Sequence, residues 1–243
     1  MAADLETARI RSLPEDAFYI ANFITEEEED LLLQKITTAP LPRWTHLSHR
    51  RLQTWPSALS KTNTLIDSPL PAWLVSPIII PRFDALGIFA DAPHGAPNHV
   101  LVNEYQPGQG IMPHEDGAAY YPLVATVSLG APIVLDLYPK GGAEGANDSD
   151  DKRHRPPQHR ILQERRSLLV TRAKIYTDFL HGIAETTADE GLGAKSICNW
   201  DLLREPQRFC GGRVERETRI SLTYRDVLKV AKLGNTMKFL GKR

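Results

Sequence analysis

The sequence predicts a mainly β fold with flanking helices. Seven short segments have the alternation or the composition of β-strands, and they are separated by turns rather than by helical segments. This arrangement favours an all-β barrel or sandwich over a chain of alternating β and α units. The seven expected strands span residues 99–105, 111–115, 124–129, 133–138, 166–170, 175–180 and 219–227.

The residues before these strands are expected to form helices and a hairpin. Thr25, followed by Glu28 and then by the apolar positions of 31–36, has the pattern of a capping box, so a helix should begin at residue 26. Residues 14–24 are expected to be an extended lead-in. Residues 40–63 contain two tryptophans among basic side chains, which suits a loop or a short hairpin.

We expect one structural domain, because no segment has the composition of a linker. Residues 1–97 should form helices and a lid that pack on a core of residues 98–243. A flexible insertion is expected near 140–160, where a glycine-rich acidic run is followed by a basic run with two prolines.

Composition limits the possible partners and compartments. The chain shows neither a signal-peptide pattern nor the roughly 18 uninterrupted apolar residues of a membrane span, so we expect no membrane partner. Two cysteines, Cys198 and Cys210, do not make a disulfide framework. With a net charge of −1, the chain would need a local basic patch to bind a polyanion. We expect a monomer.

His114-Glu115-Asp116, together with His181, has the composition of a metal site. On an extended segment, residues two apart share a face and lie about 6.6 Å apart, so His114 and Asp116 can bind one ion while Glu115 points away. Two histidines and one carboxylate suit a non-haem Fe(II) oxygenase, and these three residues are the candidate catalytic centre. Zn²⁺ would accept the same ligands and is the alternative.

Residues 219–225 alternate strictly between a polar face that carries two arginines and an apolar face. Arg219 and Arg225 would lie about 20 Å apart along such a strand. If both side chains lean inward, their guanidinium groups could bind the two ends of a short dicarboxylate. A hydrolytic zinc site needs no such pair, which favours iron. The plainer alternative is an exposed strand with its arginines in water.

These residues, with Asn103-x-Tyr105-x-Pro107-Gly108, resemble the signature of AlkB-type Fe(II)/2-oxoglutarate dioxygenases over about residues 98–228. The resemblance implies a double-stranded β-helix (jelly-roll) core, molecular oxygen as oxidant, and Fe(II) bound by the two histidines and the aspartate. It also implies that 2-oxoglutarate, the co-substrate, is bound by Asn103, Tyr105, Arg219, Ser221 and Arg225.

The same resemblance also implies which end of 2-oxoglutarate each of these residues binds. Arg225 and Ser221 would steady the carboxylate beside the metal, whereas Arg219, Tyr105 and Asn103 would hold the distal carboxylate. Ser221 departs from the family pattern, which usually has asparagine there. Its hydroxyl still offers a hydrogen-bond donor and acceptor, so a shortened contact is expected.

The family acts on methylated bases in DNA or RNA and on some proteins and lipids, which implies a nucleic-acid substrate presented as a single strand or a flipped base. The basic, tryptophan-containing segment 43–55 lies where the family has a nucleotide-recognition lid. We therefore expect Arg50, Arg51, Trp55 and Tyr120 to contact the substrate. Alternatively, the tryptophans anchor the core and the arginines are merely solvated.

The function expected from the sequence is oxidative demethylation of alkylated bases. Two alternatives stay open, namely the same oxidation on a protein side chain and a non-catalytic member of the fold that binds nucleic acid. A basic run at residues 152–155 would suit nuclear import, so cytoplasmic and nuclear localisation is expected.

Overall fold

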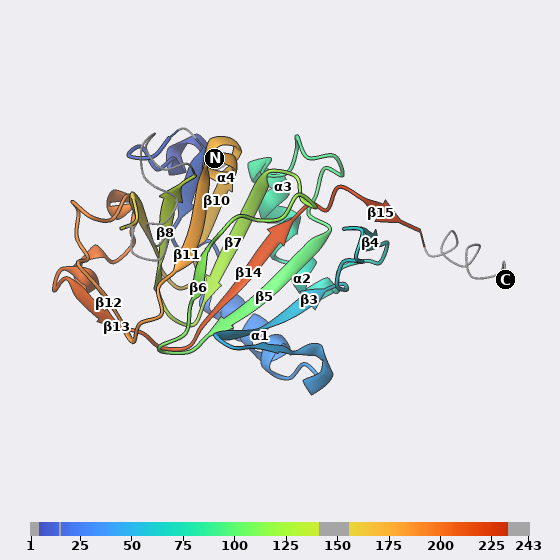
Figure 1. Ribbon diagram of the computed structural model, residues 1–243, viewed down its shortest axis with the longest axis horizontal. Coiled ribbons are helices and arrows are strands. Elements are labelled where there is room, and N and C mark those ends of the chain that lie inside the picture. Colours follow the sequence, from blue (N-terminus) through green and yellow to red (C-terminus); the bar gives the residue numbers. More distant parts are fainter. Residues whose placement is uncertain (1–4, 15, 141–155, 233–243) are drawn as a thin grey trace, which may run out of the picture.

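Two antiparallel sheets face each other in the computed structural model, which describes residues 5–14, 16–140 and 156–232 (Figure 1). The seven-stranded sheet has the order β1 (Ala17–Ile20), β10 (Leu168–Arg172), β7 (Leu123–Leu129), β14 (Arg219–Arg225), β5 (His99–Tyr105), β3 (Arg50–Trp55) and β2 (Thr45–Leu47). The four-stranded sheet has the order β6 (Ile111–His114), β11 (Phe179–Ile183), β8 (Ile133–Pro139) and β9 (His159–Gln163). The predicted jelly-roll core is confirmed.

Short helices and two-stranded ribbons complete the described fold. The helical elements are η1 (Leu5–Ala8), α1 (Glu26–Thr37), η2 (Leu41–Arg43), α2 (Ala72–Val75), η3 (Ile78–Phe83), α3 (Asp84–Leu86), α4 (Ala173–Asp178), η4 (Trp200–Leu202) and η5 (Pro206–Phe209). The ribbons pair β12 (Ala188–Glu190) with β13 (Arg213–Glu215) and β4 (Leu65–Ile66) with β15 (Val230–Ala231).

Helix α1 begins where the sequence predicts. The Thr25 hydroxyl accepts a hydrogen bond from the Glu28 backbone N–H (3.2 Å), and the Glu28 carboxylate accepts one from the Thr25 backbone N–H (2.8 Å). This capping box satisfies backbone donors that the first turn would otherwise leave without partners. Leu32 and Ile36 then turn a buried face toward the larger sheet.

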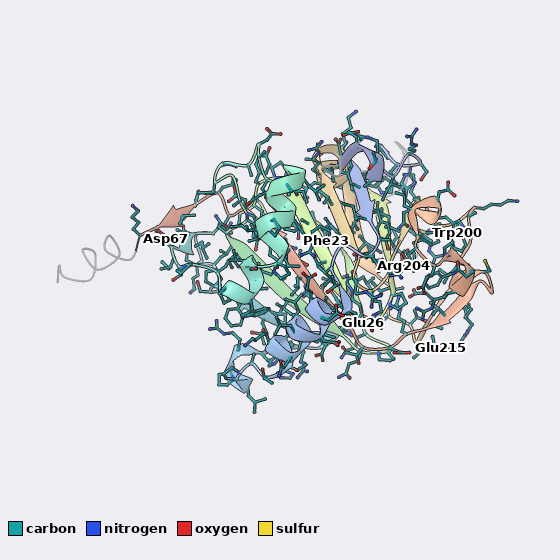
Figure 2. All side chains as sticks on the ribbon, turned by 180° about the vertical axis from the view of Figure 1, so that it is seen from behind. Phe23, Glu26, Asp67, Trp200, Arg204 and Glu215 are labelled. Atoms are coloured by element: carbon teal, nitrogen blue, oxygen red, sulfur yellow. The ribbon has the colours of Figure 1, made fainter. Side chains whose placement is uncertain are left out.

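A layer of helices covers the outer face of the larger sheet, and Figure 2 shows it from behind, with Phe23 labelled. Phe83 is central to this layer, because its ring lies 5.8 Å from that of Phe23 and 5.1 Å from that of Tyr224 on β14. The Tyr224 hydroxyl donates to the Leu74 carbonyl of α2 (2.9 Å). The apolar face of β14 is thus bound to helices, which leaves its polar face for the space between the sheets.

The β2–β3 hairpin extends the larger sheet at its edge. Strand β3 pairs antiparallel with β5, and Arg51 lies opposite Glu104. Strand β1 likewise pairs with β10, so strands from residues 1–97 and from the later part of the chain share one sheet. Of the loop or short hairpin expected within residues 40–63, the structure has the hairpin.

The expected strand at 175–180 is wrong, because Ala173–Asp178 is helical and β11 begins only at Phe179. Ile175 and Phe179 both lie in the core, four residues apart, a spacing that suits one turn of helix as well as a strand. The flexible insertion expected near 140–160 falls between β8, which ends at Pro139, and β9, which starts at His159. Residues 141–155 lie outside the described part.

Two further expectations concern the cysteines and the membrane. Cys198 and Cys210 are both free thiols. Within the described residues, no helix has the length and apolar character needed to cross a bilayer.

A buried ion pair stabilises the long segment between β11 and β14. The Arg216 guanidinium binds both oxygens of Asp189, at 2.9 and 2.6 Å, and both side chains are almost fully buried. A third guanidinium nitrogen donates to the Ala184 carbonyl at 2.6 Å. The pair therefore ties β12 to the end of β11, which carries His181.

Replacing Arg216 by alanine should lower the free energy of unfolding by roughly 3–5 kcal/mol, because it leaves the Asp189 carboxylate buried without a counter-charge. Urea denaturation followed by circular dichroism would measure the change. Arg213→Ala is the matched control, since its ion pair with Glu215 is exposed and should contribute little. Equal losses in the two variants would contradict the structural role of the buried pair.

Candidate metal centre and co-substrate cavity

A cavity of about 420 Å³ lies between the two sheets. One side carries the three residues predicted to bind metal. His114 ends β6 and faces His181 on β11 in direct register, with ring centroids 4.3 Å apart. One possible ligand atom from each of His114, Asp116 and His181 lies within 4.8 Å of the others. This is the only such group of acidic, histidine or cysteine side chains among the described residues.

The surroundings of these three side chains keep them in the protonation states and orientations that metal binding requires. The Nδ1 atom of His114 lies 2.9 Å from the Met112 carbonyl, so that Nδ1 carries the proton and Nε2 is left as the ligand atom. Burial lowers the pKa of His114 and lowers that of His181 to about 4, which leaves both imidazoles neutral at pH 7. Asp116 is held by Arg225 at 2.6 Å. The donor set therefore fits a divalent ion such as Fe(II).

The predicted co-substrate residues share one wall of the cavity. Strand β14 pairs with β5 so that Arg219 lies opposite Tyr105 and Ser221 lies opposite Asn103. All four are buried and line the cavity, as Arg225 also does. Strand register therefore brings together every residue that was expected to bind 2-oxoglutarate.

Arg219 has no carboxylate partner within the described part of the chain. Its guanidinium donates only to the Ser128 hydroxyl (2.9 Å) and the Gln163 side-chain carbonyl (3.3 Å), and its Nε has no partner there. Burial lowers the pKa of Arg219 to about 10, so the group stays cationic at pH 7. A buried cation without an anion is costly, and one carboxylate of a diacid would supply that anion.

Ser221 leaves the wall polar in spite of its short side chain. It lies between Asn103 on β5 and Ser128 on β7, and all three side chains are buried. The polar strip continues through Thr223 and Thr126, which also line the cavity.

Of the four expected substrate residues, Arg50 and Tyr120 line the cavity. Arg50 donates to the Asn103 side-chain carbonyl at 3.3 Å, which places it beside the co-substrate wall. Tyr120 lies next to Arg225, whose guanidinium carbon is 4.8 Å from the ring centre.

Arg51 and Trp55 face away from the cavity, contrary to the expected lid arrangement. Arg51 binds both oxygens of Glu104 at 2.7 Å and lies over the ring of Trp44. Trp55 packs edge-on against Trp73, with ring centroids 5.6 Å apart. Both residues share the face of β3 that meets the helical layer, because β3 is in register with β5.

Several cavity residues were not expected from the sequence. Leu59 and Asn63 come from the loop at residues 57–64, Tyr176 comes from α4, and Gln163 from β9. No local pattern marks them, since their positions depend on which segments pair. The loop, for instance, is held where β4 meets β15 and the Leu65 N–H donates to the Lys229 carbonyl (2.9 Å).

Comparison with known proteins places the chain in a family. Residues 16–225 match the model of the 2OG-Fe(II) oxygenase superfamily. The chain belongs to this superfamily. It is therefore a dioxygenase that depends on 2-oxoglutarate, Fe(II) and O₂. This agrees with the two histidines and one aspartate of the metal site, and with the lack of an acidic partner for Arg219 among the described residues.

Individual relatives confirm the AlkB-type resemblance. The chain is 38% identical to "Probable RNA/DNA demethylase ALKBH6" of Danio rerio, over 99% of this chain and 96% of the relative. It is 28% identical to "tRNA (carboxymethyluridine(34)-5-O)-methyltransferase ALKBH8" of Macaca fascicularis, over 74% of this chain but only 26% of that protein.

Solved structures share the fold. OsALKBH1 superposes with a TM-score of 0.55 at 15% identity, covering 88% of this chain and 98% of that one. A prolyl-4-hydroxylase from Pseudomonas putida gives 0.51 at 12% identity, covering 92% of this chain and 98% of that one. At these identities the likeness concerns the fold alone.

His181→Ala should abolish Fe(II) binding and leave the fold intact, because this side chain lines the cavity and is not part of the apolar core. Anaerobic titration with Fe(II) and 2-oxoglutarate would measure it, through the weak visible charge-transfer band of the chelate, with circular dichroism reporting the fold. His46→Ala, on the exposed β2, is the control and should keep the band. A normal band in His181→Ala would remove this residue from the metal site.

Proposed function

We propose that this dioxygenase removes alkyl groups, such as methyl groups, from bases of RNA or DNA. The observation that carries the proposal is the 38% identity, over nearly the whole length of both chains, with a protein named as a probable RNA/DNA demethylase. The cavity is consistent with it, since its lining combines a metal site, a cationic wall and aromatic side chains.

His114, Asp116 and His181 would hold Fe(II) and leave further coordination positions free for ligands. With 2-oxoglutarate and O₂ bound, the metal would supply the chemistry that oxidises a C–H bond of the alkyl group, and a hydroxylated N-methyl group would be lost as formaldehyde. The protein's own contribution is to position the reactants and to exclude water.

The cationic wall would orient the co-substrate. Arg219 is suited to the distal carboxylate, because its guanidinium is buried and has no acidic partner among the described residues. Tyr105 and Asn103, its neighbours on β5, would complete that end. Arg225 keeps Asp116 in place and, with Ser221, would steady the carboxylate nearer the metal.

The substrate side would be formed by Tyr120 and the loop at residues 57–64. The Tyr120 ring contacts the Arg225 guanidinium (4.8 Å from the ring centre) and the His99 ring (centroids 5.8 Å apart), and these contacts help to orient it. A flat base can stack on such a ring. Leu59 and Asn63 line the same cavity, as Arg50 of β3 does, which supports a lid that includes this loop.

We extend the proposal to a monomer that works in the cytoplasm and the nucleus. Size-exclusion chromatography with light scattering would test the first part, and imaging of a tagged full-length chain would test the second.

Turnover of methylated single-stranded oligonucleotides would test the activity. We expect formaldehyde and succinate in equal amounts, and binding that weakens as the salt concentration rises because phosphates release counterions. An unmethylated oligonucleotide of the same sequence is the control and should give no formaldehyde. Turnover of a methylated peptide but of no oligonucleotide would instead support oxidation of protein side chains.

Arg219→Ala should raise the KM for 2-oxoglutarate by roughly 30-fold or more, since loss of one partner of a buried charge pair costs about 2 kcal/mol or more. Succinate formation at varied 2-oxoglutarate would measure the change. The exposed Arg213→Ala variant should keep the wild-type KM. An unchanged KM in Arg219→Ala would contradict the role assigned to this guanidinium.

A further inference from the structure

Tyr176 lines the cavity but has no role in the reaction outlined above. It lies on α4, the short helix that links β10 to β11 and so precedes the strand carrying His181 (Figure 1). Its side chain lines the cavity, and its hydroxyl is buried without a hydrogen-bond partner among the described residues. A buried hydroxyl without a partner is destabilising, so the free protein holds a polar group at a cost.

The fold does not need this hydroxyl. Ile175, the neighbouring residue of α4, is the one buried in the core between the sheets. Tyr176 itself is only partly buried, and its ring belongs to the cavity wall. The packing of α4 would therefore be retained if the hydroxyl were removed.

The charged groups near Tyr176 are already paired. Asp116 binds Arg225 at 2.6 Å, and Glu115 binds Lys140. Burial, and next the charge of Asp116, raise the pKa of Tyr176 above its usual value, so the phenol keeps its proton at pH 7. The group is thus a neutral donor beside the metal site, with its acidic neighbours occupied.

We propose that the Tyr176 hydroxyl contacts the substrate and donates a hydrogen bond to an acceptor atom on the edge of the alkylated base. Tyr120 would bind the face of the base, and Tyr176 would read a ring nitrogen or a carbonyl oxygen. Tyr176 is then a specificity-determining residue, because a site built around a donor discriminates against bases that lack the acceptor. This inference rests on the proposed function.

Tyr176→Phe removes the hydroxyl and keeps the ring. We expect this variant to bind Fe(II) and 2-oxoglutarate normally and to be no less stable than the wild type, since it deletes a polar group without a partner. Its affinity for N-methylated single-stranded oligonucleotides should fall roughly tenfold, the effect of one hydrogen bond. Fluorescence anisotropy under anaerobic conditions would measure affinity without turnover.

A series of deaza bases tests the contact in the wild-type protein, so it does not depend on how the variant folds. In each analogue one ring nitrogen is replaced by C–H. For one analogue, we expect the wild type to bind roughly tenfold more weakly than it binds the parent base. Tyr176→Phe should bind that analogue and the parent base equally well. If the acceptor is a carbonyl oxygen, the corresponding deoxo analogue should show this pattern instead.

Tyr121→Phe is the matched control, because Tyr121 packs against the core on the helical side and should not affect binding. Suppose that the wild type binds methylated oligonucleotides, that Tyr176→Phe binds them with the same affinity, and that every analogue binds as well as its parent base. The proposed Tyr176 contact is then refuted, and the proposed function survives. If the wild type binds none of them while still binding Fe(II) and 2-oxoglutarate, both proposals fail. A loss of stability in Tyr176→Phe that matches its loss of affinity would indicate a structural role instead.

Discussion

Strand β14 is the constraint on which the rest of the structure depends. All seven of its residues are buried, and it pairs along its length with β5 on one side and β7 on the other. Its apolar residues pack against the helical layer and its polar residues face the cavity. A slip of one residue would exchange Arg219 for Ile220 at the cavity wall, so the pairing that builds the core also builds the site.

The two arginines of β14 are equivalent in the sequence pattern but differ electrostatically in the fold. Arg225 is neutralised by Asp116, so its charge is largely used to orient a metal-site residue. Among the described residues, Arg219 meets the neutral side chains of Ser128, Gln163 and Tyr105 and has no acidic partner, so its charge is available to a ligand. The cavity is therefore asymmetric, with a paired charge near the histidines and an uncompensated charge at the far end of the strand.

The parts of the site borne on strands could be predicted from the sequence, because alternation along an extended segment determines which side chains share a face. This holds for His114, which ends β6, and for the polar face of β14, whereas Asp116 lies two residues beyond the end of β6. The start of α1 was predictable from its capping box. Segment 175–180 was not, since a few apolar residues suit either a strand or a turn of helix. Tyr176, which the helix places in the cavity wall, was consequently missing from the expected site.

The orientation of the β3 side chains shows a second limit on what the sequence alone can predict. Alternation along the strand separates Arg50 from Arg51, but only pairing with β5, some fifty residues later, decides which of them meets the cavity. The loop that carries Asn63 depends on a still more distant contact, between β4 and β15. The metal-binding and co-substrate residues thus lie mainly on strands or at their ends, whereas the proposed substrate contacts lie on a helix and on loops. Such segments tolerate change without disturbing the sheets, so substrate preference can vary while the oxidative site stays fixed.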